Sequence, residues 1–489
     1  MAGHLTIRGV PSAVAMDAWW LDNSRATPTS SRQAAVGWTR RAGALLALIV
    51  TGDMLFYGHP FGLNLALFAV LLVLLSGWSR GTGLEARAAM ALLLAIAPVL
   101  EEVQGLSVLF LVLGLAVTVF RQQSGLFPGP DMLARLFRAY LRALPSGVVR
   151  AVASLRGGMF RVRVKPRAML RDWALPLGGA LILTSLLAEA NPVLSDWIEQ
   201  LSFEGPNLEK LLRRGLFWGG LALVIWPVFT ELVTGTTERR NARVVLLPGV
   251  NAGSVTKALV LFNLLMAAQT ISDLAILWGG GALPEGMTYA QYAHRGAYPL
   301  LVTACLAGAF AIAASPFLSE RKGLKVLMFL WLGQNVLLTL SAGYRLWLYV
   351  GVYGLTYLRI HAAIWMLCVV LGLVLVAVQI RWNRPTGWFL KHGGAAGMAV
   401  LYLCCFVNFA DVIARHNLTH VERLDHYYLC QLGPGAAAAL RDSQQVVSCA
   451  ATPPQVQGWR DWGFRSWRIN RYLESSNREG AQHENPRGG

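Results

Sequence analysis

Charged and aromatic side chains interrupt an otherwise apolar stretch at residues 344–361. Ionisable residues in such a stretch are costly in a membrane and usually face a bundle interior or a water-filled path. If the stretch is read as one helix, steps of three and four place its polar members on one face, namely Arg345, Tyr349, Tyr353, Thr356 and Arg359. The spacing predicts a polar surface that could hold an anion or a lipid headgroup.

Further polar side chains are expected at the same membrane face. Asp273 lies in the seventh apolar segment, and Asn408 and Asp411 lie in the last one. The loop at residues 279–296 adds four more, Tyr289, Tyr292, His294 and Arg295. Together with the 344–361 stretch they form a predicted outward-facing site. The alternative is that the arginines pair with the aspartates and tyrosines to hold helices together, because buried polar groups usually satisfy one another.

The composition places the chain in a membrane. Hydrophobic residues make up 55% of the 489 positions and charged residues only 14%, which departs far from the balance of soluble proteins. The apolar segments have the length that an α-helix needs to cross a hydrocarbon core of about 30 Å. We predict an all-α integral membrane protein with about eleven transmembrane helices, near residues 43–58, 63–79, 86–101, 104–120, 174–191, 214–234, 256–279, 296–316, 325–343, 361–381 and 394–413.

Basic residues set the expected orientation and the divisions of the chain. They gather before the first segment and in alternate loops, as the positive-inside rule requires of cytoplasmic loops. The N-terminus is therefore predicted inside, and an odd number of spans places the C-terminus outside. Five divisions follow: an N-terminal arm at 1–40, a four-span block at 41–120, a basic cytoplasmic loop at 121–172, a seven-span block at 173–413 and a periplasmic C-terminal region at 414–489, whose polar end at 475–489 is expected to be disordered.

The net charge of +17 is concentrated in the cytoplasmic loop, where ten Arg and one Lys face two Asp. Within it, apolar residues recur at helical spacing over 132–144, with arginines between them. This pattern is typical of an interfacial amphipathic helix that meets anionic lipid headgroups. The alternative is that the arginines only retain the loop inside. Either way the partner is the membrane, and nucleic acid is not expected.

The C-terminal region carries two cysteines, Cys430 and Cys449. An oxidising periplasm could join them in a disulfide, and the alternative is two free thiols. His416 and His420 lie four positions apart, which makes a divalent metal conceivable, but two histidines on an interfacial helix are common without one. No metal or cofactor is predicted. The sequence has none of the short motifs of zinc proteases, serine hydrolases or dithiol redox proteins.

Several polar blocks together resemble a bacterial membrane-protein family, domain of unknown function 4173. The more specific blocks are Met287-Thr-Tyr-Ala-Gln-Tyr292 and Tyr353-Gly-Leu-Thr356, and Thr51-Gly-Asp-Met-Leu-Phe-Tyr-Gly-His-Pro-Phe-Gly62 supports them. The resemblance covers residues from about 45 to about 470. It implies a multi-pass protein of the bacterial inner membrane and brings no activity or catalytic residues. The two tail cysteines and the Arg-rich N-terminal arm depart from that family's pattern.

Three functions are compatible with these features. A transporter or permease is favoured, on the ground that most many-span proteins transport solutes, with Asp273, Asp411 and Glu189 as candidate proton or ion carriers. A membrane enzyme could instead grip a lipid-linked phosphate with Arg295, Arg345 and Arg359, although no catalytic pair is recognisable. In the third hypothesis the chain is an assembly or sensory subunit whose tail docks a protein partner through its aromatic residues, Trp459, Trp462, Phe464 and Trp467.

Overall fold

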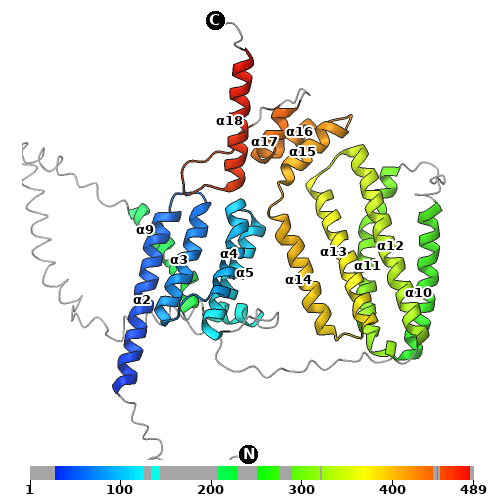
Figure 1. The fold of residues 1–489 in the computed structure, drawn as a ribbon, viewed down its shortest axis with the longest axis horizontal. Helices are drawn as coiled ribbons and strands as arrows, with labels where there is room; N and C mark the ends of the chain where they lie inside the picture. Colours follow the sequence, from blue (N-terminus) through cyan, green and yellow to red (C-terminus); the bar gives the residue numbers. More distant parts are fainter. Residues whose placement is uncertain are drawn as a thin grey trace, which may run out of the picture. The chain divides into compact units, whose positions relative to one another are not determined.

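The structure is a computed structural model, and its regular elements are helical throughout the part it describes (Figure 1). The described residues are 28–125, 134–143, 208–229, 251–275, 289–319, 322–443, 449 and 452–484, with side chains described over a slightly smaller set. In chain order the main helices are α2 (Pro28–Phe56), α3 (Leu63–Arg80), α4 (Ala86–Glu101), α5 (Gly105–Ser124), α9 (Leu208–Phe229), α10 (Ala252–Asp273), α11 (Tyr289–Ala314), α12 (Lys322–Tyr353), α13 (Tyr357–Arg381), α14 (Thr386–Cys404), α15 (Phe409–His420), α16 (His426–Gln431), α17 (Ala437–Asp442) and α18 (Phe464–Glu484).

Six of the described helices are long and apolar enough to cross a membrane: α3, α5, Glu209–Phe229 of α9, α10, Gly323–Tyr353 of α12, and α13. A bent pair, α14 with α15, would add one more. The predicted count of eleven is therefore not confirmed, and the predicted span at 174–191 lies outside the described residues. The all-helical membrane class is confirmed.

The last predicted span, 394–413, is not one straight helix. α14 ends at Cys404, and α15 leaves at 69° to it. Asn408 explains the break, because its side-chain oxygen accepts a hydrogen bond from the Asp411 amide at 3.3 Å and so starts a new helix. Asp411 therefore lies in the first turn of α15 and not within a continuous span.

The stretch 344–361 is also divided between two helices. α12 continues to Tyr353, ten residues beyond the predicted end of that span at residue 343. Gly354 then adopts a φ of +77°, a left-handed conformation that ends a helix readily only at glycine. The Thr356 hydroxyl accepts from the Arg359 amide at 3.5 Å and caps α13. The single polar helix face predicted from residue spacing is consequently wrong beyond Tyr353.

The chain forms two compact units, and the first comprises residues 1–60, 64–93 and 114–235. Its described core joins α2, α3, α5 and α9 through apolar side chains that include Leu48, Phe68, Leu72, Val119, Ile225 and Phe229. The turn between α2 and α3 is held by fully buried Asn64, which donates to the carbonyls of Leu55 and Pro60 at 2.8 and 2.9 Å. On α2, Asp53 forms an ion pair with Arg214 of α9.

The predicted interfacial helix at 132–144 is a helix over the described residues 134–143, within the first unit. Leu136 is buried, whereas Phe137 is 64% exposed, so the helix has one packed and one open side. Tyr140 donates its hydroxyl to the carbonyl of Val224 at 2.7 Å, which attaches this helix to α9. Contact with lipid headgroups stays a prediction.

The second unit comprises residues 61–63, 94–113 and 236–489. Its membrane core packs α10, α11, α12 and α13 around buried residues that include Leu259, Ala307, Met328, Trp331, Leu332, Leu373 and Val376. A separate apolar cluster holds α15, α16 and α17 together and includes Ile413, Leu418, Leu429 and Ala436. The last helix, α18, packs Ile469 and Leu473 against Ala437 of α17.

Candidate functional site

Asp273 and Arg345 form a buried ion pair between the end of α10 and the long helix α12. The side chains are 3% and 6% exposed. Gln269, one turn earlier on α10, donates its amide to Asp273 Oδ1 at 2.9 Å. The sequence predicted that Asp273 and Arg345 would lie at the same level, and the structure brings these two together. Removing one partner from such a pair leaves a buried charge uncompensated.

Two buried amides lie further along these helices, Asn263 on α10 and Asn335 on α12. Asn263 donates to the carbonyls of Leu259 and Leu327 at 2.7 and 3.0 Å, which links the two helices. Asn335 is fully buried and donates to the Trp331 carbonyl at 2.8 Å. The side-chain oxygens of Asn263 and Asn335 accept no hydrogen bond from any described residue. The seam between α10 and α12 therefore combines a buried charge pair with one open hydrogen-bond acceptor, Asn263 Oδ1.

The other members of the 344–361 stretch form a separate corner between α12 and α13. The Arg359 guanidinium lies 4.5 Å from the centre of the Tyr349 ring, and Tyr349 and Tyr353 have ring centres 4.8 Å apart. Arg359 also donates to the carbonyls of Tyr353, at 2.8 Å, and Gly354. Arg359 thus caps the C-terminus of α12, because the last carbonyls of a helix have no hydrogen-bond donors within the helix. It makes these contacts while Arg345 pairs with Asp273, so the two arginines are not assembled as one phosphate clamp.

Asn408 and Asp411 belong to a third group, at the start of α15. Asn408 donates to the carbonyl of Gly435 at 2.8 Å, and Asp411 accepts from Arg415 Nε at 2.9 Å. Arg415 is also 3.1 Å from Asp442 at the end of α17. Asp411 Oδ1 is buried and accepts no hydrogen bond from the described residues. This group stabilises the α15–α17 cluster, and its role in ligand binding stays a prediction.

The remaining four predicted site residues lie in the first turns of α11, as expected for a helix starting at Tyr289. The side chains of Tyr289, Tyr292, His294 and Arg295 lie outside those that the structure describes. The predicted site is thus divided into separate groups with their own partners. Asp273 with Arg345 is the most deeply buried of those described.

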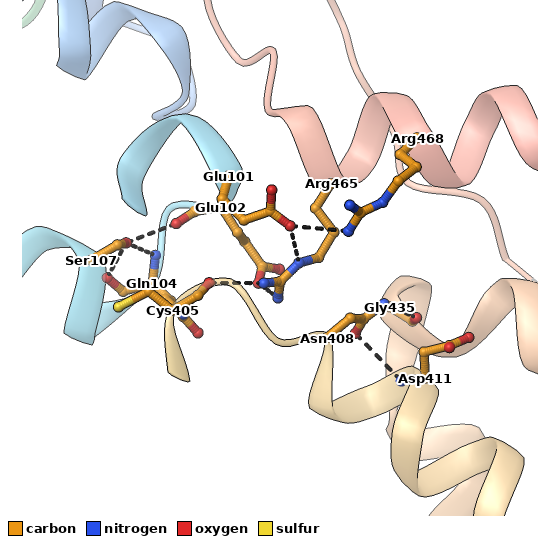
Figure 2. Close-up of polar contacts among 10 residues, drawn as sticks. All are labelled: Glu101, Glu102, Gln104, Ser107, Cys405, Asn408, Asp411, Gly435, Arg465 and Arg468. Carbon is orange, nitrogen blue, oxygen red and sulfur yellow. Dashed lines mark hydrogen bonds and ion pairs between the residues drawn. The ribbon is translucent and has the colours of Figure 1, made fainter. Parts of the chain in front are cut away.

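A cluster that sequence reasoning missed lies where α18 meets the ends of α4 and α14 (Figure 2). Arg465 donates Nε to Glu101 at 3.2 Å and Nη2 to the carbonyl of Cys405 at 2.9 Å, and it also pairs with Glu102. Arg468 reaches Glu101 at 3.1 Å. Arg465 and Glu101 are 6% and 8% exposed. The available signal was the Glu101–Glu102 doublet at the end of an apolar segment, with arginines three apart in the tail.

The loop before α18 is attached to the same end of the second unit. Leu63 donates its amide to the carbonyl of Trp462 at 2.9 Å. A Cβ at Gly62 would lie 2.4 Å from the carbonyl carbon of Asp461, so this close approach requires glycine. The Asp461 carboxylate accepts from the amides of Gln457 and Gly458 at 2.7 and 2.8 Å. The segment that bears the tail aromatic residues is therefore held against residues 62–63 of the same chain.

The predicted disulfide between Cys430 and Cys449 is present, with Cα atoms 5.8 Å apart. The other four cysteines are free thiols in the structure. His416 and His420 stack with ring centres 4.9 Å apart. Among the described residues no third metal-ligating side chain joins them.

The fold and these sites define a multi-pass helical membrane protein whose second unit holds ion pairs buried on both sides. Residues 43–443 match the model of a domain of unknown function, DUF4153, and the chain belongs to this family. The expected membership of a family of unknown function is confirmed, but the match does not support the number 4173. Neither a curated protein nor a solved structure matches the chain.

Proposed function

We propose that the chain is a transporter of the bacterial inner membrane whose second unit carries a small anionic solute along the α10–α12 seam. Asp273 and Arg345 form the coupling site in this proposal. The N-terminus faces the cytoplasm and the C-terminus the periplasm, in keeping with the positive-inside pattern of the loops.

The observation that carries the proposal is the burial of the Asp273–Arg345 pair, with the open acceptor Asn263 Oδ1 about 15 Å further along α10. A charge pair inside a bundle costs desolvation energy, so apolar side chains would pack these helices at least as well. A functional role would explain why this ion pair is present, if Asp273 and Arg345 each bind another ion during transport. Arg345 could release Asp273 to bind an anion, and a proton or cation would then neutralise Asp273. Binding of the solute and protonation of Asp273 would thereby be coupled.

Flux through reconstituted protein tests the proposal. Proteoliposomes with a trapped pH indicator would be offered inorganic phosphate, a monocarboxylate and a dicarboxylate under an imposed pH gradient. Wild-type protein should import at least one of these anions with proton movement. Asp273→Asn should abolish coupled flux. Asp53→Asn is the matched control, because it removes a buried carboxylate that pairs with half-exposed Arg214 in the first unit. Absence of flux from correctly inserted wild-type protein, or equal flux in Asp273→Asn, contradicts the proposal.

A charge-reversed double variant separates coupling from simple helix locking. If the pair only holds α10 to α12, Asp273→Arg combined with Arg345→Asp should restore both thermal stability and flux. If Asp273 is the proton carrier, stability should recover while flux stays lost. Recovery of both in the double variant would reduce the pair to a structural contact.

A second candidate function, an assembly subunit that binds a protein partner through its tail, is favoured by α18. Phe464 and Trp467 are 40% and 39% exposed, and Arg468 and Arg471 lie over their rings at 5.4 and 5.2 Å. This exposed row suits an acidic or aromatic partner surface. A photocrosslinker at Trp467 should then give one defined product in cells, which Arg471→Ala weakens. A crosslinker at exposed Tyr427 is the control. No difference between the two positions would reject this candidate.

A further inference from the structure

A groove of about 400 Å³ runs between α12 and α13 in the second unit. Eight residues form its walls: Phe329, Leu332, Gly333 and Val336 from α12, and Leu373, Val374, Ala377 and Val378 from α13. None of these side chains has a polar atom. Water gains no hydrogen bonds in such a groove, so hydrocarbon is the better occupant.

Gly333 leaves the α12 wall of the groove open. A Cβ at this position would meet no atom within 4 Å, and the residue is exposed. On the facing helix, Val374 is 46% exposed. Because α12 and α13 both qualify as membrane-spanning helices, the surroundings of this groove are lipid chains. An acyl chain can therefore enter from the side.

One end of the groove is cationic and aromatic. Arg381, the last residue of α13, and Trp382, which is 60% exposed, line it. Lys325 and Arg384 lie close by: Lys325 Nζ donates to Asn383 Oδ1 at 3.1 Å, and the Arg384 amide donates to the Gln379 carbonyl at 2.9 Å. No carboxylate of the described residues forms an ion pair with Arg381. Tryptophan at the headgroup level and clustered basic residues are typical of an interface that holds anionic lipid.

We propose that the α12–α13 groove is a binding site for an anionic phospholipid. One acyl chain lies against the apolar walls, the phosphate pairs with Arg381, and the Trp382 indole lies at the headgroup level. Lys325 and Arg384 add positive charge around the headgroup. This proposal requires only that α12 and α13 cross a membrane, so it does not depend on transport.

Native mass spectrometry of the purified full chain tests the site. The protein would be titrated with phosphatidylglycerol and, separately, with phosphatidylcholine that has the same acyl chains. We expect tighter binding of the anionic lipid by the wild type. Arg381→Gln should reduce that preference about fivefold, the effect of one basic residue near a charged headgroup. Arg87→Gln is the matched control, since it removes an exposed arginine from the first residues of α4, which belong to the other unit.

Filling the groove tests the acyl-chain contact. Gly333→Leu places a side chain in open space without a clash, so the fold should persist while both lipids bind more weakly. Gly351→Leu is its control, because Gly351 also has nothing within 4 Å and lies about 27 Å further along the same helix.

Several outcomes would overturn the proposal: equal binding of the two lipids, Arg381→Gln behaving as Arg87→Gln, or Gly333→Leu behaving as Gly351→Leu. A dimer peak that Gly333→Leu removes would assign the groove to a second copy of the chain instead.

Discussion

Arg465, in the first turn of α18, donates its Nε hydrogen to Glu101 at the end of α4 at 3.2 Å, although 364 positions separate the two residues. The same guanidinium donates to the carbonyl of Cys405, where α14 has just ended, at 2.9 Å. Terminal carbonyls of a helix need partners from elsewhere, and Arg465 supplies one for α14. One buried side chain of the last helix thus contacts the ends of two earlier helices.

We predict that Arg465→Gln loosens the N-terminal end of α18 from α4 and α14, while Ile469 and Leu473 still pack against Ala437. Glu101 is 8% exposed and would lose its buried partner, so the free energy of unfolding of this end should fall by about 3 kcal/mol. Amide hydrogen exchange in α18 should become faster. Arg468→Gln is the control, because Arg468 also contacts Glu101 but is 51% exposed, and its loss should cost less than about 1 kcal/mol. Similar exchange in the two variants would contradict the assignment of the attachment to Arg465.

The corner between α12 and α13 predicts a second measurable effect. Gly354 has a φ of +77°, and a Cβ there would lie 2.8 Å from Asn417 Oδ1. The Asn417 side-chain amide makes two hydrogen bonds that hold it in place. Its oxygen accepts from the Leu355 amide at 2.6 Å, and its nitrogen donates to the Leu355 carbonyl at 3.0 Å. Gly354→Ala should therefore destabilise the second unit by about 1–3 kcal/mol in thermal or denaturant unfolding.

Gly351→Ala provides the comparison for this corner. Gly351 lies one turn earlier, inside α12, and has open space at its Cβ position. Alanine favours a helix over glycine by about 0.5–1 kcal/mol, so this variant should be neutral or more stable. If Gly354→Ala is equally well tolerated, the left-handed corner does not constrain the fold.

The helices and the deepest ion pair could be predicted from local sequence. Long apolar segments located the helices, and the cost of charge in a membrane singled out Asp273 and Arg345. Both were expected at the same membrane face, but the sequence did not say which of the polar residues there would pair. The disulfide between Cys430 and Cys449 was likewise accessible from the position of the two cysteines in the tail.

Helix breaks and distant contacts were harder to predict. The break after Tyr353 depends on a glycine followed by a capping threonine, signals that a helical spacing count over 344–361 ignores. The break before Asn408 depends on that one side chain as a cap. No local sequence signal predicts the contact between Arg465 and Glu101. The tail has several arginines and the chain several carboxylates, and many other pairings of them were equally compatible with the sequence. The contact between Arg465 and Glu101 is determined by the tertiary structure.

The disulfide leads to a third prediction, about compartment. In intact cells Cys430 and Cys449 should resist alkylation until a reductant is added, because a disulfide persists on the oxidising side of a membrane. Replacing both with serine should lower the stability of the tail by about 3 kcal/mol, since the bridge closes a loop between residues 19 positions apart. Cys305→Ser, at an exposed free thiol, should have no such effect. Alkylation of both cysteines without reduction would place the tail in a reducing compartment.

A fourth prediction concerns Tyr472 on α18, which donates its hydroxyl to Asp442 of α17 at 2.8 Å. That hydrogen bond favours the protonated phenol and raises the pKa of Tyr472 above the ordinary value of about 10. Because the pKa is higher in the folded chain than in the unfolded one, the contact stabilises the fold fully below pH of about 10 and is lost as the pH rises through the raised pKa.

Ultraviolet absorbance of the phenolate, taken as the difference between wild type and Tyr472→Phe, should therefore show ionisation of Tyr472 above pH of about 10. Asp442→Asn removes the charge that opposes ionisation and should move the midpoint of this difference titration to lower pH. Arg415 also contacts Asp442, at 3.1 Å, so Arg415→Gln should not lower the midpoint if Asp442 causes the shift. A midpoint unchanged by Asp442→Asn would show that the hydrogen bond between α17 and α18 does not control the ionisation of Tyr472.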